Sequence, residues 1–512
     1  MQTPEDFAEQ GKAINDWRKI RMGKVYSLYN KKLRDANALD FDDLLWHTVR
    51  LLETAGDVRE YYQRKFRYIL IDEYQDTNAL QYRLAALLTN QEKNICVVGD
   101  DDQSIYRFRG ADITNILSFE RQFKGARVIR LEQNYRSTQN ILDAANAVIR
   151  HNQGRKGKTL WTENGRGELV TVKTTYNESD EANFVLGQIM MYYRRGGNWG
   201  DCAVLYRTNA QSNALEYAFK RNGIPYRIIG GTRFFDRAEV KDMLSYLCVI
   251  NNRADDLRLK RIINNPPRGL GAKTIETAER LAQAGKIPLY SVVSDPYSYG
   301  PLEKPAAKLM QFSAFIEGMA QLLEEGISLP DFYEELLIRS GYVDMLNAKQ
   351  TEENKTRLEN VRELKSSINS YVQNTDDPTL AGFLEEIALY TDLEQYNQGD
   401  DAVVMMTMHS AKGLEFPNVF LVGFEEGLFP GMRAIGDQAE MEEERRLCYV
   451  AITRAKKCLT ISHARQRMLY GSTASALPSR FLKEIPEECI VKKGGFRVAQ
   501  ETGYGARTEG RS

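Results

Sequence analysis

Hydrophobic and polar residues follow two alternating patterns through the first half of the chain. Short apolar runs at 67–72, 94–99 and 127–131 each precede a stretch with helical periodicity, at 78–89, 112–123 and 138–151. A second series has apolar runs at 168–174, 201–206 and 225–229 and helical stretches at 179–195, 210–221 and 238–251. Short strands that alternate with longer helices predict parallel, doubly wound sheets.

The segments around these two series have a different pattern. Residues 1–56 predict helices, at 13–34 and 38–53, and residues 253–397 predict one helix after another. Strands return at 402–408 and 418–424, followed by a helix at 440–457 and a strand at 458–462. The chain is therefore predicted to hold two α/β domains, the second interrupted by an all-helical insertion. The glycine-rich end from about 488 predicts a flexible tail.

Composition narrows the class of protein without indicating a function. The 512 residues carry a net charge of −1, which neither indicates nor excludes nucleic-acid binding. The six cysteines form no C-x-x-C pair and there are only four histidines, so a zinc site is not expected and the pattern suits a reducing cytosol. The start is acidic and polar, and no apolar run is long enough to span a membrane. We expect a cytoplasmic, multidomain protein without membrane association.

Acidic residues follow two of the predicted strands. Asp72 and Glu73 end the first, where one carboxylate could hold a magnesium ion and the other could activate a water. A solvated acidic strand end is an equally weighted interpretation of these two residues alone. The next strand leads into Gln103, which could sense a terminal phosphate, and into Tyr106, Phe108 and Arg109. Aromatic rings interleaved with arginines are typical of a groove that binds single-stranded nucleic acid.

Further candidates follow the later strands. Tyr135 and Arg136 come after the third predicted strand, and Arg454 lies on or just after a predicted helix. Arginine suits the spread charge of a phosphoryl group because its planar fork donates two hydrogen bonds, although a lone arginine is usually a surface or ion-paired residue. His409, Lys412, Gly413 and Glu415 form a loop after another strand.

Eight motifs, in this order, resemble the series of the UvrD/PcrA/Rep helicases of superfamily 1A. They are LDFDDLL, LIDEYQDTN, VGDDDQSIYRFRGA, LEQNYRS, VLYRTNAQS, IPYRIIGGTRFFDRAEVKD, MTMHSAKGLEF and EEERRLCYVAITRA. The resemblance runs from about residue 37 to residue 471 and is closest to PcrA and UvrD. It implies an α/β fold with two RecA-like parallel-sheet motor domains, the first incomplete, and a large all-helical insertion in the second. It also implies an ATP-dependent 3′–5′ DNA helicase and translocase of repair or replication.

The resemblance also implies a division of the chain and a role for each candidate residue. The divisions are 1–56 (end of a helical subdomain), 57–136 (partial first motor domain), 137–252 and 398–487 (second motor domain), 253–397 (helical subdomain) and 488–512 (tail). The implied cofactors are ATP and Mg²⁺. Asp72 would hold the magnesium ion, Glu73 would activate the water, and Gln103 would couple the γ-phosphate to DNA. Tyr135 would stack on adenine, Arg136 and Arg454 would be arginine fingers, and Glu415 would contact the nucleotide.

DNA is the implied partner, as single strands and as single/double-strand junctions. The residues implied to line the single-strand track are Phe41, Tyr106, Phe108, Arg109, His409 and Tyr470. Phe108 stands where the family generally has tryptophan, so its stacking should be weaker but retained. Gly431 stands where a DNA-contacting histidine often occurs, which removes that contact.

The largest departure from the family is a missing motif. The 512 residues contain no phosphate-binding G-x-x-x-x-G-K-[S/T] loop. GRKGKT at 154–159 has the wrong spacing and follows a helix, so it is predicted to be an exposed basic linker. PRGLGAKTIETA at 267–278 predicts a glycine turn, with Gly269 and Gly271, that opens a helix and holds duplex phosphates; a plain helix start is equally weighted.

Two hypotheses follow from this departure. In the first, the chain is the later part of a longer helicase and begins partway through its helical subdomain. In the second, it is a non-catalytic DNA-binding remnant that keeps the DNA-facing residues without hydrolysis. Both should bind single strands in a salt-dependent way, but only the first should hydrolyse ATP in response.

Overall fold

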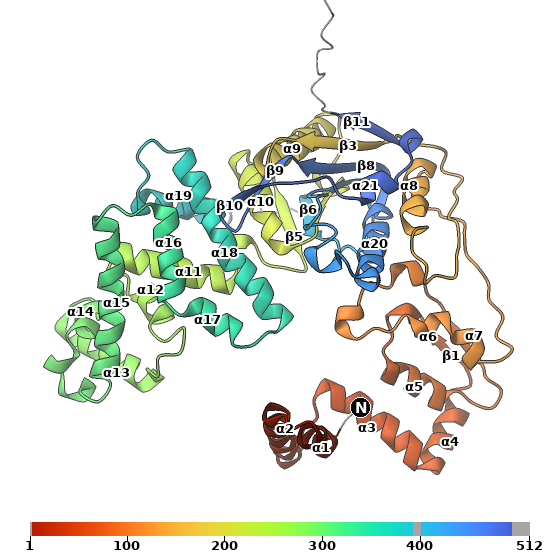
Figure 1. The fold of residues 1–512 in the computed structure, drawn as a ribbon, viewed down its shortest axis with the longest axis horizontal. Helices are drawn as coiled ribbons and strands as arrows, with labels where there is room; N and C mark the ends of the chain where they lie inside the picture. Colours follow the sequence, from red (N-terminus) through yellow and green to blue (C-terminus); the bar gives the residue numbers. More distant parts are fainter. Residues whose placement is uncertain (1–2, 393–400, 494–512) are drawn as a thin grey trace, which may run out of the picture. The chain divides into compact units, whose positions relative to one another are not determined.

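The computed structural model describes residues 3–392 and 401–493, and the chain divides into two compact units (Figure 1). Unit 1 comprises residues 1–131 and 153–158, and unit 2 comprises residues 132–152 and 159–512. Each unit carries part of the predicted site. The finer division into domains that the sequence indicated stays a prediction.

Helices form most of the described part of unit 1. The longer ones are α1 (Pro4–Ala13), α2 (Trp17–Asp35), α3 (Phe41–Thr54), α4 (Gly56–Lys65) and α5 (Ala79–Leu88). The helix predicted at 13–34 corresponds to α2, which begins four residues later because the chain turns between α1 and α2. The Asp16 carboxylate starts α2 by accepting the N–H groups of Arg18 at 2.9 Å and Lys19 at 3.3 Å. α4 was not predicted.

The sheet of unit 1 has two strands in the described residues. β1 (Ile69–Ile71) pairs in parallel with β2 (Ile95–Val97). The strand predicted at 127–131 is wrong: these described residues form no strand, and Ile129 and Leu131 are exposed. A hydrophobic run becomes a strand only where a neighbour completes its hydrogen bonds, and no described residue does so here. The helix predicted at 112–123 is split at Ser118 into α6 (Thr114–Leu117) and α7 (Phe119–Gln122).

Unit 2 is built on a seven-stranded parallel sheet with the order β11-β3-β8-β7-β4-β6-β5. Figure 1 labels β11, β3, β8, β6 and β5 of this sheet. Its strands are β3 (Val170–Thr175), β4 (Cys202–Tyr206), β5 (Tyr226–Ile229), β6 (Val403–Thr407), β7 (Phe416–Leu421), β8 (Ala455–Ala464) and β11 (Ile490–Lys493). Strand β4, which lies between β7 and β6, is buried along its whole length. A parallel strand covered on both faces needs such an uninterrupted apolar run, which is why the sequence revealed it.

The helices around this sheet follow the sequence closely, with two corrections. They are α8 (Gln139–Ile149), α9 (Glu178–Arg194), α10 (Ser212–Arg221), α20 (Gln438–Ile452) and α21 (Phe481–Glu484). The helix predicted at 440–457 ends earlier, because Ala455 pairs with Phe416 of β7 and starts β8. The tail predicted from 488 begins with β11, which pairs with β3. The rest of that predicted tail, 494–512, lies outside the described residues.

A helical segment connects β5 to β6, as predicted. It comprises α11 (Ala238–Asn251), α12 (Asp256–Ile262), α13 (Ala272–Gly285), α14 (Leu289–Ser294), α15 (Ala306–Glu324), α16 (Leu329–Arg339), α17 (Tyr342–Asn347), α18 (Glu352–Gln373) and α19 (Leu380–Asp392). These helices share one apolar core, which includes Tyr246, Phe312 and Leu364. Across the described parts of both units, no helix has the length and hydrophobicity that crossing a membrane requires.

Candidate functional site

The acidic pair at the end of β1 is exposed. The backbone turns sharply at Glu73, whose φ of +50° lies in the left-handed region that few non-glycine residues occupy. The Oδ1 atom of Asp72 accepts the Glu73 N–H at 2.8 Å, which holds the turn. Both carboxylates lie at the surface beside the sheet end. Exposed carboxylate oxygens are the ligands that Mg²⁺ takes while keeping several waters, so the donor set fits this ion.

Gln75, which the sequence analysis missed, connects this pair to the end of β2. Its side chain is fully buried, and its Nε2 donates to Oε2 of Glu73 at 2.5 Å. Its Oε1 accepts the backbone N–H of Asp100 at 2.9 Å. A Cβ atom at Gly99 would lie 2.5 Å from that Oε1, so only glycine allows the approach. One sequence signal for this role of Gln75 was available: it is an uncharged amide two residues after Glu73, inside a motif rich in acids.

Gln75→Leu is expected to destabilise unit 1 by about 1–3 kcal/mol, because the Asp100 N–H loses its acceptor while the apolar volume is kept. The measurement is the unfolding of unit 1 in a denaturant titration, followed by amide hydrogen exchange in β1 and β2. Gln91→Leu, at an exposed position of the same unit, is the matched control. Equal stability of the two variants would contradict a structural role for the Gln75 amide.

The acids after β2 are paired with basic residues. Gln103 donates from Nε2 to Oδ2 of Asp100 at 2.8 Å. Asp102 is buried and accepts two hydrogen bonds from Arg155, at 2.9 and 2.6 Å, while Lys158 pairs with Asp100. The interpretation of 154–159 as an exposed basic linker is therefore wrong. No local pattern indicated this pairing, because the carboxylates that Arg155 and Lys158 neutralise lie more than 50 residues earlier in the chain.

Aromatic and cationic side chains gather just after this acidic loop. The ring centroids of Tyr106 and Phe108 lie 6.1 Å apart. The Arg109 guanidinium lies 5.3 Å from the Tyr106 centroid and 5.4 Å from that of Phe108. Phe108 is 55% exposed, so part of its side chain faces solvent. Phe41, at the first position of α3, is also exposed.

Unit 2 brings four of the predicted nucleotide-site residues into one region. The Arg136 guanidinium donates to Glu415 at 2.5 Å, and Lys456 pairs with the other Glu415 oxygen at 2.6 Å. The hydrogen bonds from Lys456 and Arg136 lower the pKa of Glu415 to about 2. The ring of the neighbouring Tyr135 is 79% exposed. This region thus offers a free aromatic face beside a cluster of two cations and one carboxylate.

Arg454 belongs to the same region but is buried. Its Nε donates to the carbonyl of Val450 at 2.9 Å, and its Nη1 donates to the carbonyl of Leu414 at 3.3 Å. Arg136 also reaches the carbonyl of Thr453 at 3.3 Å. The end of α20 and the loop before β7 are therefore held together by arginines. Arg454 thus contacts Leu414, the residue directly before Glu415.

The remaining predicted contacts lie elsewhere in unit 2. His409 lies in the loop after β6, and Tyr470 lies in the turn of the hairpin β9 (Gln466–Leu469) and β10 (Ser472–Ser475). The predicted glycine turn does open a helix: Gly269 has a φ of +69°, and Gly271 is the N-cap of α13. The carbonyl of Gly269 accepts from Lys308 at 3.2 Å. Whether this turn holds phosphate stays a prediction.

Comparison with known proteins identifies the class. The profile of the UvrD/REP helicase N-terminal domain matches residues 2–124, and that of the UvrD-like helicase C-terminal domain matches residues 129–466. The chain is 47% identical over 494 residues to the ATP-dependent DNA helicase PcrA of Staphylococcus epidermidis RP62A, covering 96% of this chain and 67% of that protein. The PcrA helicase of Staphylococcus aureus Mu50 gives the same identity and coverage.

One solved structure, the C-terminal domain of a possible DNA helicase from Lactobacillus plantarum WCFS1, is 14% identical. The comparison covers 70% of this chain and 98% of that one, with a TM-score of 0.27, which is too low to bear on the fold. The two family profiles and the parallel-sheet fold define a superfamily 1A helicase. More particularly, the chain belongs to the UvrD/PcrA-like family of ATP-dependent DNA helicases.

Proposed function

We propose that the chain acts in an ATP-dependent DNA helicase that moves 3′ to 5′ along single-stranded DNA during repair or replication. The observation that carries this proposal is the exposed Asp72–Glu73 pair, held at the end of β1 by the buried Gln75. A strand end that fixes two carboxylates in a strained turn fits the hydrolysis of a magnesium-bound triphosphate. The direction of movement rests on the family resemblance alone.

Unit 1 contributes the hydrolytic carboxylates. Asp72 would hold Mg²⁺, which supplies charge neutralisation at the phosphates when it is bound. Glu73 would orient the attacking water and accept its proton. Gln75 keeps the Glu73 carboxylate from rotating, and Gln103 sits on the adjoining loop against Asp100. A shift at the phosphate would therefore reach the loop that carries Tyr106 and Phe108.

Unit 2 contributes a ring and two arginines. The exposed Tyr135 ring would stack on adenine, and Arg136 and Arg454 would stabilise the charge that develops on the transferred phosphoryl group. Glu415 holds Arg136 by a direct ion pair, so binding of a nucleotide has to share or replace that partner. This arrangement keeps the arginine oriented before any nucleotide arrives.

DNA contacts are proposed on both units. Phe41, Phe108 and Arg109 present exposed rings and charge on unit 1, while Tyr470 and His409 would contact the single strand on unit 2. Gly269 and Gly271 would bring the N-terminal amides of α13 to the phosphates of a duplex at a single/double-strand junction.

A second candidate function follows from the lack of a phosphate-binding loop in these 512 residues. Because these 512 residues contain no such loop, a DNA-binding protein without hydrolysis is the alternative. The test measures ATP hydrolysis with and without oligo(dT), for this chain and for the complete product of its gene, together with the salt dependence of DNA binding. Hydrolysis that oligo(dT) stimulates supports the helicase. Salt-dependent binding without hydrolysis by either protein supports the alternative.

Phe108→Ala is expected to weaken the binding of oligo(dT) by about 1–3 kcal/mol, because a base loses its stacking partner. The measurement is a fluorescence anisotropy titration at fixed salt. Phe66→Ala removes another exposed ring of unit 1 that no motif includes, and is expected to leave affinity unchanged. An equal loss in both variants would contradict a specific contact at Phe108.

A further inference from the structure

Tyr470 lies in a turn whose backbone conformation is unfavourable for tyrosine. Leu469 pairs with Ser472 across the β9–β10 hairpin, which leaves Tyr470 and Gly471 as a two-residue turn. Both have positive φ, +54° and +77°. Such turns favour Asn-Gly or Asp-Gly, and tyrosine adopts this conformation only when its surroundings impose it.

One face of α18 supplies those surroundings. Oε2 of Glu363 accepts the Tyr470 N–H at 3.0 Å, and Oγ of Ser366 accepts the Gly471 N–H at 3.0 Å. Nδ2 of Asn369 donates to the Gly471 carbonyl at 2.8 Å. The three side chains are spaced three residues apart, so they lie along one side of the helix. The helical segment therefore holds the backbone of both turn residues.

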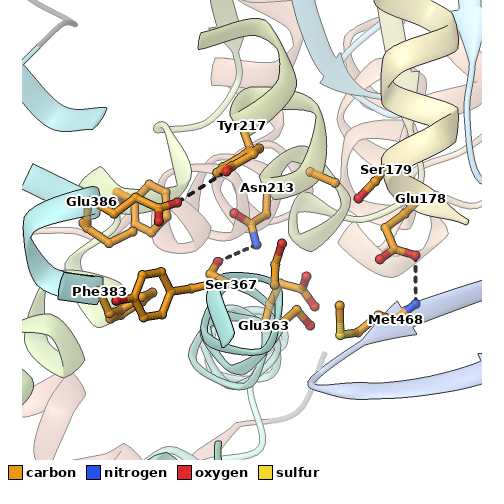
Figure 2. Close-up of a pocket in the computed structure, with 15 residues that line it drawn as sticks. Glu178, Ser179, Asn213, Tyr217, Glu363, Ser367, Phe383, Glu386 and Met468 are labelled. Carbon is orange, nitrogen blue, oxygen red and sulfur yellow. Dashed lines mark hydrogen bonds between the residues drawn. The ribbon is translucent and has the colours of Figure 1, made fainter. Parts of the chain in front are cut away.

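The rest of the hairpin has anchors outside α18, besides a contact of 3.7 Å from Nδ2 of Asn369 to the Met468 sulfur. The Met468 N–H donates to Glu178 at 3.0 Å, which Figure 2 shows beside Glu363. At the base of the hairpin, Arg467 pairs with Glu181 at 2.5 Å. Because the strands have these other anchors, the hydrogen bonds from α18 to the backbone of Tyr470 and Gly471 act chiefly on the conformation of the turn.

We propose that Glu363 is a positioning residue, which sets the Tyr470 backbone through its N–H and so aims the Tyr470 ring at single-stranded DNA. The inference rests on the proposed function, in which Tyr470 contacts that strand. It makes the helical segment a part of the DNA track, although α18 itself carries none of the residues that the motifs assigned to DNA. Ser366 and Asn369 hold the backbone of Gly471 in the same way, through hydrogen bonds to its N–H and its carbonyl.

The environment of Glu363 gives this role a distinctive pH dependence. Burial raises the pKa of Glu363 to about 7, although hydrogen bonds from the Tyr470 N–H, Asn213 and Ser366 oppose the rise. The titratable and charged groups that face it or line the adjoining pocket are Glu178 of α9, Tyr217 of α10, Arg237 before α11, Tyr371 of α18, Glu386 of α19 and Tyr470. Because the Tyr470 N–H hydrogen bond favours the ionised carboxylate, that bond should strengthen as Glu363 ionises above about pH 7, although the buried charge lowers the stability of the fold as a whole.

The test combines amide hydrogen exchange at Tyr470 and Gly471 with oligo(dT) affinity in the full chain. Glu363→Ala is expected to reduce protection of the Tyr470 amide by up to about tenfold, as for one lost hydrogen bond, and to weaken binding no more than Tyr470→Ala does. Glu363→Gln keeps an acceptor, so it should restore both and remove the change in protection between about pH 6 and 8. Glu353→Ala, at an exposed position of α18, is the control. If Glu363→Ala does not fold, Ser366→Ala tests whether α18 holds the turn, because it removes the hydrogen bond to the Gly471 amide. The measurement is then the protection of that amide.

Three results would overturn the inference, and they separate it from the proposed function. Unchanged protection in Glu363→Ala means that the hydrogen bond does not hold the turn. Lost protection with normal DNA affinity, when Tyr470→Ala does weaken binding, leaves the DNA contact standing and removes the positioning role. Normal affinity in both variants removes Tyr470 from the proposed DNA track, and the inference with it.

Discussion

Arg467→Met is expected to lower the free energy of unfolding of unit 2 by about 3–5 kcal/mol. The Arg467 guanidinium donates to Glu181 at 2.5 Å and to both Glu425 oxygens at 2.6 and 2.7 Å, and all three side chains are buried. Burial alone would lower the pKa of Arg467, but the charges of Glu181 and Glu425 outweigh it and raise the pKa above its usual value. Removing the cation leaves two carboxylates buried together.

The measurement is unfolding of the full chain by urea, with amide exchange in β8 and β9 to assign the transition to unit 2. Two-state analysis applies only to that transition, because the chain has more than one unit. Arg465→Met, an exposed arginine two residues earlier, is the control and is expected to change stability by less than about 0.5 kcal/mol. Adding Glu181→Gln and Glu425→Gln to Arg467→Met should recover much of the loss. A loss below about 1 kcal/mol in the single variant would contradict the buried triad.

Glu363→Gln is expected to stabilise unit 2 increasingly as the pH rises, by up to about 3 kcal/mol. Burial holds the pKa of Glu363 at about 7 in the folded chain, above the ordinary value of 4.5. Below about pH 4.5 the carboxyl is protonated in both the folded and the unfolded chain, so its pKa shift costs nothing. As the pH rises towards 7, only the unfolded chain ionises, and the folded state loses stability relative to it. Because glutamine cannot ionise, the Glu363→Gln variant does not lose stability in this way.

The difference between Glu363→Gln and the parent chain should therefore grow between about pH 4.5 and 7 and become constant above about pH 7. Urea unfolding at a series of pH values measures it directly. Glu353→Gln removes an exposed carboxylate from the same helix and should show no such trend. A difference that stays constant with pH would show that folding does not raise the pKa of Glu363.

The candidate residues that the sequence predicted are those that a local pattern of neighbouring residues marks. Asp72 and Glu73 end an apolar run, and the run alone placed them at a sheet edge. Gln75 escaped notice because its importance depends on Asp100, which reaches it only when β1 pairs with β2. Arg155 and Lys158 were misjudged for a similar reason, since the acids that they pair with are distant in the chain. Glu363 carried no signal, because nothing near it in sequence shows that α18 meets the Tyr470 turn.

The sequence by itself determined the order of strands β3 to β8 and of the helices between them, because each buried parallel strand and each amphipathic helix needs its own hydrophobic period. It also determined the family, because the order of eight motifs is specific where any single motif is not. Only the tertiary structure decided whether 127–131 forms a strand, where α20 gives way to β8, and which charges are neutralised. Those outcomes depend on partners distant in the chain: a strand needs a neighbour for its hydrogen bonds, and a buried charge needs an opposite one.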